Sequence, residues 1–194
     1  MAGRGRAAAQ VTSRDAASQL VAVAASRNVK DSVETVRQYG GLISTAKRWD
    51  CPFFNPPEMA ALGSKHTIIE AIASLIDAGV SGALEKWVDD LFGKPVDFAD
   101  HIFGTGPRIE ITFEGTFPKG TIKLVAKAES TQVYSIVSGG KRVVEWPKLP
   151  QRYDLRTTTS FGHFTIMDVA RLLRSGTLNT NKSPATQALL DLSK

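Results

Sequence analysis

The chain has 194 residues, a length for one domain or two small ones, and its 42% of hydrophobic residues excludes disorder throughout. Its one cysteine, Cys51, excludes an intrachain disulfide, and no apolar run approaches the roughly 20 residues that span a bilayer. We therefore expect a protein that is neither secreted nor transmembrane, located in the cytoplasm or in an assembled particle such as a virion. The formal net charge is +5.

The N-terminal part of the sequence predicts a basic arm followed by helices. Residues 1–11 are rich in Gly, Ala and Arg and lack an apolar period, so we expect a mobile arm there. Thr12 and Asp15 stand at capping-box spacing and predict a helix through Ala25. Helical spacing then continues in residues that should face the core, namely Val29, Val33, Val36 and Tyr39. Asn28 either separates two helices or lies within one long helix, and propensity leaves both open.

Two further helices show the clearest pattern of the helical region, which we place at residues 12–106. Prolines within residues 51–57 exclude a regular helix, and the next helix should begin at a Ser64 cap and end at Gly79. Its apolar stripe comprises Ile68, Ile69, Ile72, Leu75 and Ile76. A second helix, capped by Ser81, should turn inward Leu84, Trp87, Val88 and Leu91. Because the connection is short, the two helices should pack as an antiparallel hairpin.

From Pro107 the apolar period changes from helical to alternating, which predicts an antiparallel β region over residues 107–160. The expected strands run over Arg108–Glu114, Ile122–Lys127, Gln132–Val137 and Lys141–Trp146, with Arg152–Thr158 as a candidate fifth. Gly139 and Gly140 should form the tight turn of a hairpin, because both positions tolerate positive φ.

The C-terminal part, residues 161–194, predicts a short helix and a tail. Thr165 and Asp168 repeat the capping-box spacing and open a helix through Arg174. Ser183-Pro184 predicts the start of a last helix that ends at Leu192. The fold class is therefore α+β: N-terminal helices packed on a four- to five-stranded antiparallel sheet, with one or two short C-terminal helices and one continuous core.

Charge is distributed unevenly along the chain. Residues 1–58 carry a net charge of +3, residues 59–106 carry −4, and residues 107–194 carry +6. The acidic candidates for a subunit contact lie on the second helix of the hairpin: Glu85, Asp89 and Asp90. The basic candidates, for a contact with a subunit or with nucleic acid, are Arg4, Arg6, Lys123, Lys127, Lys141, Arg142, Arg152 and Arg156. An uneven charge distribution of this kind is informative about binding partners and not about the fold.

The sequence motifs that could indicate a catalytic, metal-binding or phosphate-binding site are weak. A Cys51–histidine nucleophile pair lacks local support, and a cysteine in an aromatic, proline-rich loop is commonly a buried inert thiol. Asp97, Asp100 and His101 have metal-ligand types but no second cluster, so a polar connector explains them better. Residues 104–106 precede a strand rather than a helix, which fits a turn and not a phosphate cradle. We therefore expect no catalytic residue, no metal and no cofactor.

We hypothesise a non-enzymatic assembly protein that forms homo-oligomers through contacts of the acidic helix with the basic sheet, as in the coat, neck or tail of a virus or phage particle. The alternative is a nucleic-acid-binding module that uses the basic sheet and arm, with aromatic rings such as Tyr134 available to stack on bases. A second alternative is a small hydrolase or nuclease that uses His101 and His163.

Overall fold

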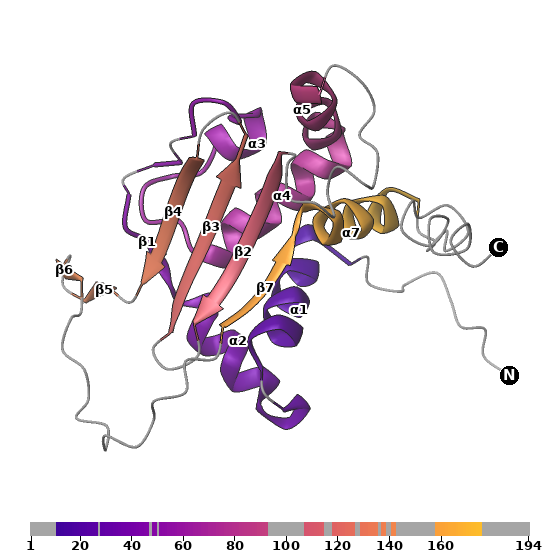
Figure 1. Ribbon diagram of the computed structural model, residues 1–194. Coiled ribbons are helices and arrows are strands. Elements are labelled where there is room, and N and C mark those ends of the chain that lie inside the picture. The colour runs from indigo at the N-terminus through magenta and orange to yellow at the C-terminus, as the bar shows by residue number, and fades with distance from the viewer. Residues whose placement is uncertain are drawn as a thin grey trace, which may run out of the picture.

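The computed structural model describes residues 11–26, 28–46, 48–49, 51–92, 107–114, 118–126, 129–135, 137–138, 141–142 and 158–175. These residues form two layers, in which helices cover one face of a five-stranded antiparallel sheet (Figure 1). The helices are α1 (Ser13–Ala25), α2 (Ser32–Gly40), α3 (Pro57–Ala60), α4 (Ile68–Ser81), α5 (Ala83–Phe92) and α7 (His163–Ser175), with a 3₁₀ turn η1 (Val29–Asp31). The protein is therefore α+β, as the sequence predicts.

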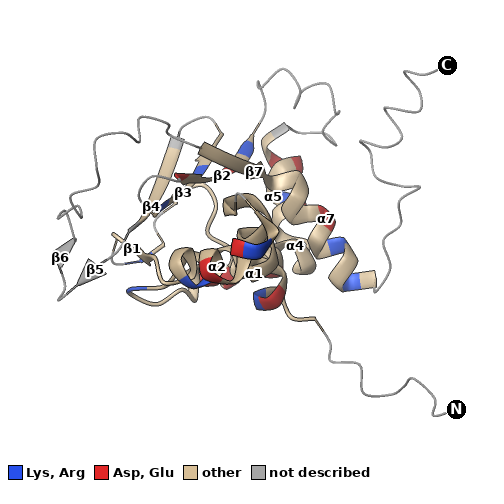
Figure 2. Ribbon diagram, turned by 90° about the horizontal axis from the view of Figure 1, so that it is seen from below, with Lys and Arg blue, Asp and Glu red and all other residues tan. Residues whose placement is uncertain are grey.

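The sheet has the strand order β1-β4-β3-β2-β7. Its strands are β1 (Ile43–Ser44), β2 (Arg108–Glu114), β3 (Lys119–Val125), β4 (Glu129–Ser135) and β7 (Thr158–Gly162). The alternating pattern predicted the inner face correctly, because Ile109, Ile111 and Phe113 are all buried. Figure 2 shows the strands on one side and the helices on the other, so the second face of the sheet is not covered by any described helix.

The helix α4 lies at the centre of the helical layer. It begins at a capping box in which Thr67 and Glu70 bond each other's backbone N–H groups, and it ends at Gly82 with φ 86°. Both predicted ends were wrong. Ser64 lies outside the helix, and Gly79 lies inside it, because a glycine at that position serves packing rather than termination.

Gly79 is the point at which α7 crosses α4. A Cβ atom there would lie 2.7 Å from the Cβ of Ala170 on α7, a distance that real Cβ atoms do not tolerate. At the first turn of α4, Ile68 packs over Gly120 of β3, where a Cβ would collide with the Ile68 side chain. Two glycines thus let α4 approach both α7 and the sheet.

The predicted inward residues of α5 do face the core. Leu84, Trp87 and Val88 are buried, and Leu91 is half-buried against the core cluster. Trp87 packs against Phe53 and Phe54 of the proline-containing loop, with ring centroids 6.5 and 4.9 Å away. The described helices and the sheet contribute to one hydrophobic core cluster.

The first two helices differ from the expected stripe. The capping box of Thr12 and Asp15 is present, and η1 separates α1 from α2 at Asn28. However, Val29 and Val33 are exposed, whereas Val36 packs against the core and Tyr39 is buried, as predicted. α1 ends in extended backbone at Ser26 and η1 begins at Val29, so the expected stripe is confirmed only in its second half, which lies on α2.

The β region holds one strand that the sequence pattern missed and one short hairpin that it predicted. β1 pairs with the edge of β4, in a part of the chain where no strand was predicted. The strands β5 (Val137–Ser138) and β6 (Lys141–Arg142) pair around the predicted glycine turn, but they form a separate two-stranded sheet. The additional strand of the main sheet is β7, which pairs with β2 and begins where the candidate fifth strand was expected to end.

α7 begins at His163 and not at the predicted Thr165 cap, because β7 leads directly into the helix. The His163 ring is buried, and its Nδ1 accepts the backbone N–H of Ile109 at 3.4 Å. Asp168, the other residue of the predicted capping box, pairs instead with Arg171 at 3.4 Å. The predicted arm over residues 1–11, apart from Val11, and the predicted helix that ends at Leu192 lie outside the described residues.

We predict that Gly79→Ala lowers the free energy of unfolding. Alanine favours a helix over glycine by about 1 kcal/mol, but forcing a methyl into this crossing costs about 1–3 kcal/mol. Chemical denaturation monitored by circular dichroism should give a net loss that Ala170→Gly partly reverses when the two are combined. Gly63→Ala is the matched control, because no atom lies within 4 Å of its added Cβ. Equal stability of Gly79→Ala and the unmodified protein would contradict the close crossing.

Candidate functional site

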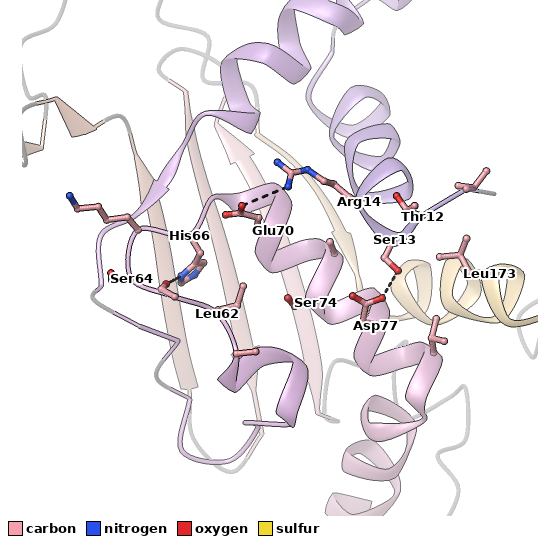
Figure 3. Close-up of a pocket in the computed structure, with 16 residues that line it drawn as sticks. Thr12, Ser13, Arg14, Leu62, Ser64, His66, Glu70, Ser74, Asp77 and Leu173 are labelled. Carbon is pink, nitrogen blue, oxygen red and sulfur yellow. Dashed lines mark hydrogen bonds and ion pairs between the residues drawn. The ribbon is translucent and has the colours of Figure 1, made fainter. Parts of the chain in front are cut away.

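An open groove of about 940 Å³ runs over the outward side of α4 (Figure 3). α4 forms its floor with side chains spaced three and four residues apart: Glu70, Ala73, Ser74, Asp77 and Val80. One wall comes from the start of α1, and the opposite wall comes from the loop of residues 61–66. Leu173 of α7 closes one end. A cavity of this size is at the upper end of the range of typical ligand pockets.

The α1 side of the groove is held by polar contacts to α4. Ser13 donates a hydrogen bond to Asp77, and Arg14 lies 3.8 Å from a carboxylate oxygen of Glu70. The hydrogen bonds from Thr12, above all from its side chain, hold the pKa of the Asp15 carboxyl below its usual value. These contacts fix the first turn of α1 against α4, so this wall of the groove is an ordered one.

The remaining surface of the groove combines small and apolar side chains with the polar loop residues Ser64, Lys65 and His66. The short side chains of Ala73 and Ser74 project little from α4, while Leu62 and Leu173 lie on two sides of the groove floor (Figure 3). Val11 also lines the groove, and 63% of its surface is exposed. Exposed apolar side chains beside a groove are common at surfaces that bind proteins or other ligands.

His66 forms the base of the loop wall and is tied to the sheet. Its Nδ1 lies 2.9 Å from the carbonyl oxygen of Gly63, which only accepts, so Nδ1 carries the proton. Its Nε2 therefore accepts the hydroxyl of Tyr134 on β4, at 3.1 Å. Burial raises the pKa of Tyr134. The histidine is a bridge between the loop and the sheet.

Among the described residues other than glycine, only Lys65 adopts a left-handed backbone conformation, with φ 65°. It lies directly before His66 in the groove wall. Such a conformation costs of order 1 kcal/mol for a residue with a Cβ and persists where surrounding contacts hold it. Here the hydrogen bonds of His66 to Gly63 and Tyr134 supply those contacts.

The acidic candidates all lie on α5, but they differ in their surroundings. Glu85 lies 3.4 Å from Arg171 and 3.9 Å from Arg174, both on α7. Asp89 and Asp90 are exposed. Glu85 therefore already has cationic partners within the chain, whereas the two aspartates face solvent.

Among the basic candidates, Lys123 is the one whose side chain the structure describes. It lies on the uncovered face of the sheet, directly opposite Glu110 in the register of β2 and β3. On the same strand pair, Lys119 forms a 2.6 Å ion pair with Glu114. The backbones of Lys141 and Arg142 form β6, and the other basic candidates lie outside the described residues: Arg4, Arg6, Lys127, Arg152 and Arg156. The described part of this face is thus mixed in charge rather than basic.

Tyr134 is not available for stacking on a base, because it is fully buried beneath the helices. Sequence alternation does not reveal this, since Tyr134 shares its strand face with Gln132, a polar residue that only the structure shows to be buried. On β2, β3, β4 and β7, none of the described residues that point to the uncovered face is aromatic. These residues are Arg108, Glu110, Thr112, Glu114, Lys119, Thr121, Lys123, Val125, Thr131, Val133, Thr158, Ser160 and Gly162.

The residues considered for catalysis or metal binding are dispersed or lie outside the described ranges. Cys51 is buried, and His163 is buried beside β2. Asp97, Asp100, His101 and residues 104–106 are not among the described residues. Within the described ranges, no three His, Cys, Asp or Glu side chains gather closely enough to hold a metal ion.

Comparison with known proteins found no match to a family model, to a curated protein or to a solved structure. Among the described helices, none is both long and apolar enough to cross a membrane.

The sequence interpretation missed the groove, although part of its pattern was present. Thr67 and Glu70 stand at capping-box spacing, and small or polar residues recur at helical spacing opposite the isoleucine stripe. That pattern identifies the outward side of α4. It does not show that α1 and the loop of residues 61–66 rise on either side of it, because those contacts join distant parts of the sequence.

We predict that the buried hydroxyl of Tyr134 makes the protein less stable at high pH. An unfolded tyrosine ionises near pH 10, while the folded one stays protonated, so the free energy of unfolding should fall by up to about 1.4 kcal/mol per pH unit above pH 10. Tyr134→Phe should remove that slope, at a cost near neutral pH of about 1 kcal/mol for the lost hydrogen bond. Denaturation curves at pH 9 and pH 11 provide the measurement. Identical slopes in both proteins would contradict the proposed burial.

Proposed function

We propose that this protein is a non-enzymatic assembly protein whose copies associate head to tail. The contact joins the exposed aspartates of α5, Asp89 and Asp90, to the basic β5–β6 hairpin of the next copy, which carries Lys141 and Arg142. Opposite charges at a contact of this kind steer association and fix its orientation.

The observation that carries the proposal is the position of the two segments. In Figure 1 α5 lies at one end of the molecule and the β5–β6 hairpin lies at the other. Patches on opposite ends of a molecule cannot meet within one copy. They can meet between copies, and repetition of that contact forms a ring or a filament.

The internal ion pairs support the choice of these residues. Arg171 and Arg174 already partner Glu85, and Glu114 already partners Lys119. A contact with a second copy stabilises these already paired charges less than it stabilises charges that face solvent. The proposal therefore retains Asp89 and Asp90 from the acidic set and moves the basic side of the contact from the sheet to the hairpin.

Repeated contacts of this geometry are what coats, necks and tails of virus particles are built from, and we propose a role of that class. This last step is an analogy of design and rests on no structural relative. Nucleic-acid binding remains the alternative. It has less support, because Lys123 faces Glu110 and Tyr134 is buried.

We predict that Asp89→Lys combined with Asp90→Lys abolishes self-association. In light scattering at low salt, the unmodified protein should exceed the 20.9 kDa of one chain, and the variant should not. Raising salt to 1 M should also dissociate the unmodified protein, because the Debye length falls from about 10 Å at 0.1 M to about 3 Å.

The matched control is Asp31→Lys combined with Glu34→Lys, which makes the same charge change at an exposed corner of η1 and α2. This control should assemble like the unmodified protein. A single-chain mass for the unmodified protein, or loss of assembly in both variants, would contradict the proposal. A ratio of absorbance at 260 and 280 nm that indicates bound nucleic acid, lost on raising salt, would favour the alternative.

A further inference from the structure

Within the part of the chain that the structure describes, no helix covers the groove over α4. Its floor carries Ala73 and Ser74, short side chains that would allow another helix to approach α4 closely. Leu62 and Leu173 lie on opposite sides of the groove (Figure 3), and Val11 also lines it. The groove thus combines a low floor and apolar side chains with charged groups such as Glu70, Asp77 and Arg14, a mixture that suits a short amphipathic helix.

The C-terminal sequence contains one segment with the matching pattern. Ser183 and Pro184 are favourable residues for a helix cap and a first helical position. The stripe that follows has helical spacing and consists of small and large apolar residues, namely Ala185, Ala188, Leu189 and Leu192. A helix this short is not stable alone in water, so it needs a surface on which to pack.

The two features are joined by a short length of chain. α7 ends at Ser175, two residues after Leu173, which itself lines the groove. The eight residues from 176 to 183 reach at most roughly 26–29 Å when extended. A helix of 14 residues such as α4 is about 21 Å long, so the segment can reach any part of the floor.

We propose that the groove binds the C-terminal segment of the same chain, residues 183–194, as an amphipathic helix that covers α4. A short tether gives an effective concentration in the millimolar range, so the segment of the same copy outcompetes the segment of a second copy. The N-terminal residues 1–10 also begin at the groove, but they have no apolar stripe to place in it. This inference is independent of the head-to-tail contact between copies.

The experiment measures the reactivity of a thiol placed on the floor of the groove. Ala73→Cys in the full-length chain should react slowly with a maleimide reagent, because the docked segment covers it. Adding Leu189→Asp and Leu192→Asp should speed the reaction by about tenfold or more, the change expected when a segment docked for roughly 90% of the time is released. The native Cys51 is 3% exposed, and its own rate is measured in the parent protein and subtracted.

Two further variants complete the design. A chain that ends at residue 182 should show the same acceleration as the double aspartate variant. Val33→Cys, at a position that is 81% exposed and distant from the groove wall, should react at one rate with and without the aspartates. Protection should not change with protein concentration, because the segment belongs to the same copy.

Equal rates for Ala73→Cys with and without the aspartates would overturn the proposal. Protection that disappears on dilution would also overturn it, since the occupant would then be a second copy. Neither result bears on the head-to-tail contact, which is tested through Asp89 and Asp90. Conversely, a single-chain mass at every salt concentration would leave this prediction unchanged.

Discussion

The close approach of α4 to two neighbours is the constraint on which the rest of the structure depends. Gly120 admits Ile68 onto the sheet, and Gly79 admits Ala170 of α7 onto the opposite part of the helix. With both neighbours this close, α4 buries most of its surface, and only the stripe that floors the groove faces outward. The position of α4 also fixes α5, which follows it after Gly82, and thereby the end of the molecule that presents the exposed aspartates.

The sequence was informative wherever a local pattern decides the structure. The alternation around Ile111, the cap at Thr12 and the inward face of α5 were all predictable, since each depends on residues a few positions apart. The fold class follows from the same patterns. Gly79 shows the limit of that reasoning, because near the end of an apolar stripe a glycine resembles a helix stop. Its true role becomes visible only once α7, some ninety residues further along the chain, is in place.

Long-range pairing explains the other differences. β1 is two residues long and is defined by its partner on β4, so its own sequence carries little indication of a strand. The exposure of Val29 and Val33 follows from the break between α1 and α2, which apolar spacing alone does not reveal. The candidate site behaves in the same way. The sequence identifies charged residues, but only the fold shows that Glu85 is already paired while Asp89 and Asp90 face solvent.

The central claim is that the acidic end of one copy binds the basic hairpin of the next, and a mixing experiment tests it most directly. One variant carries Asp89→Lys and Asp90→Lys, so both of its contact ends are basic. The other carries Lys141→Glu and Arg142→Glu, so both of its ends are acidic. Each alone should remain a single chain in light scattering at low salt, and an equimolar mixture should assemble into large alternating complexes. A mixture whose mass is only the average of the two separate samples would contradict the account.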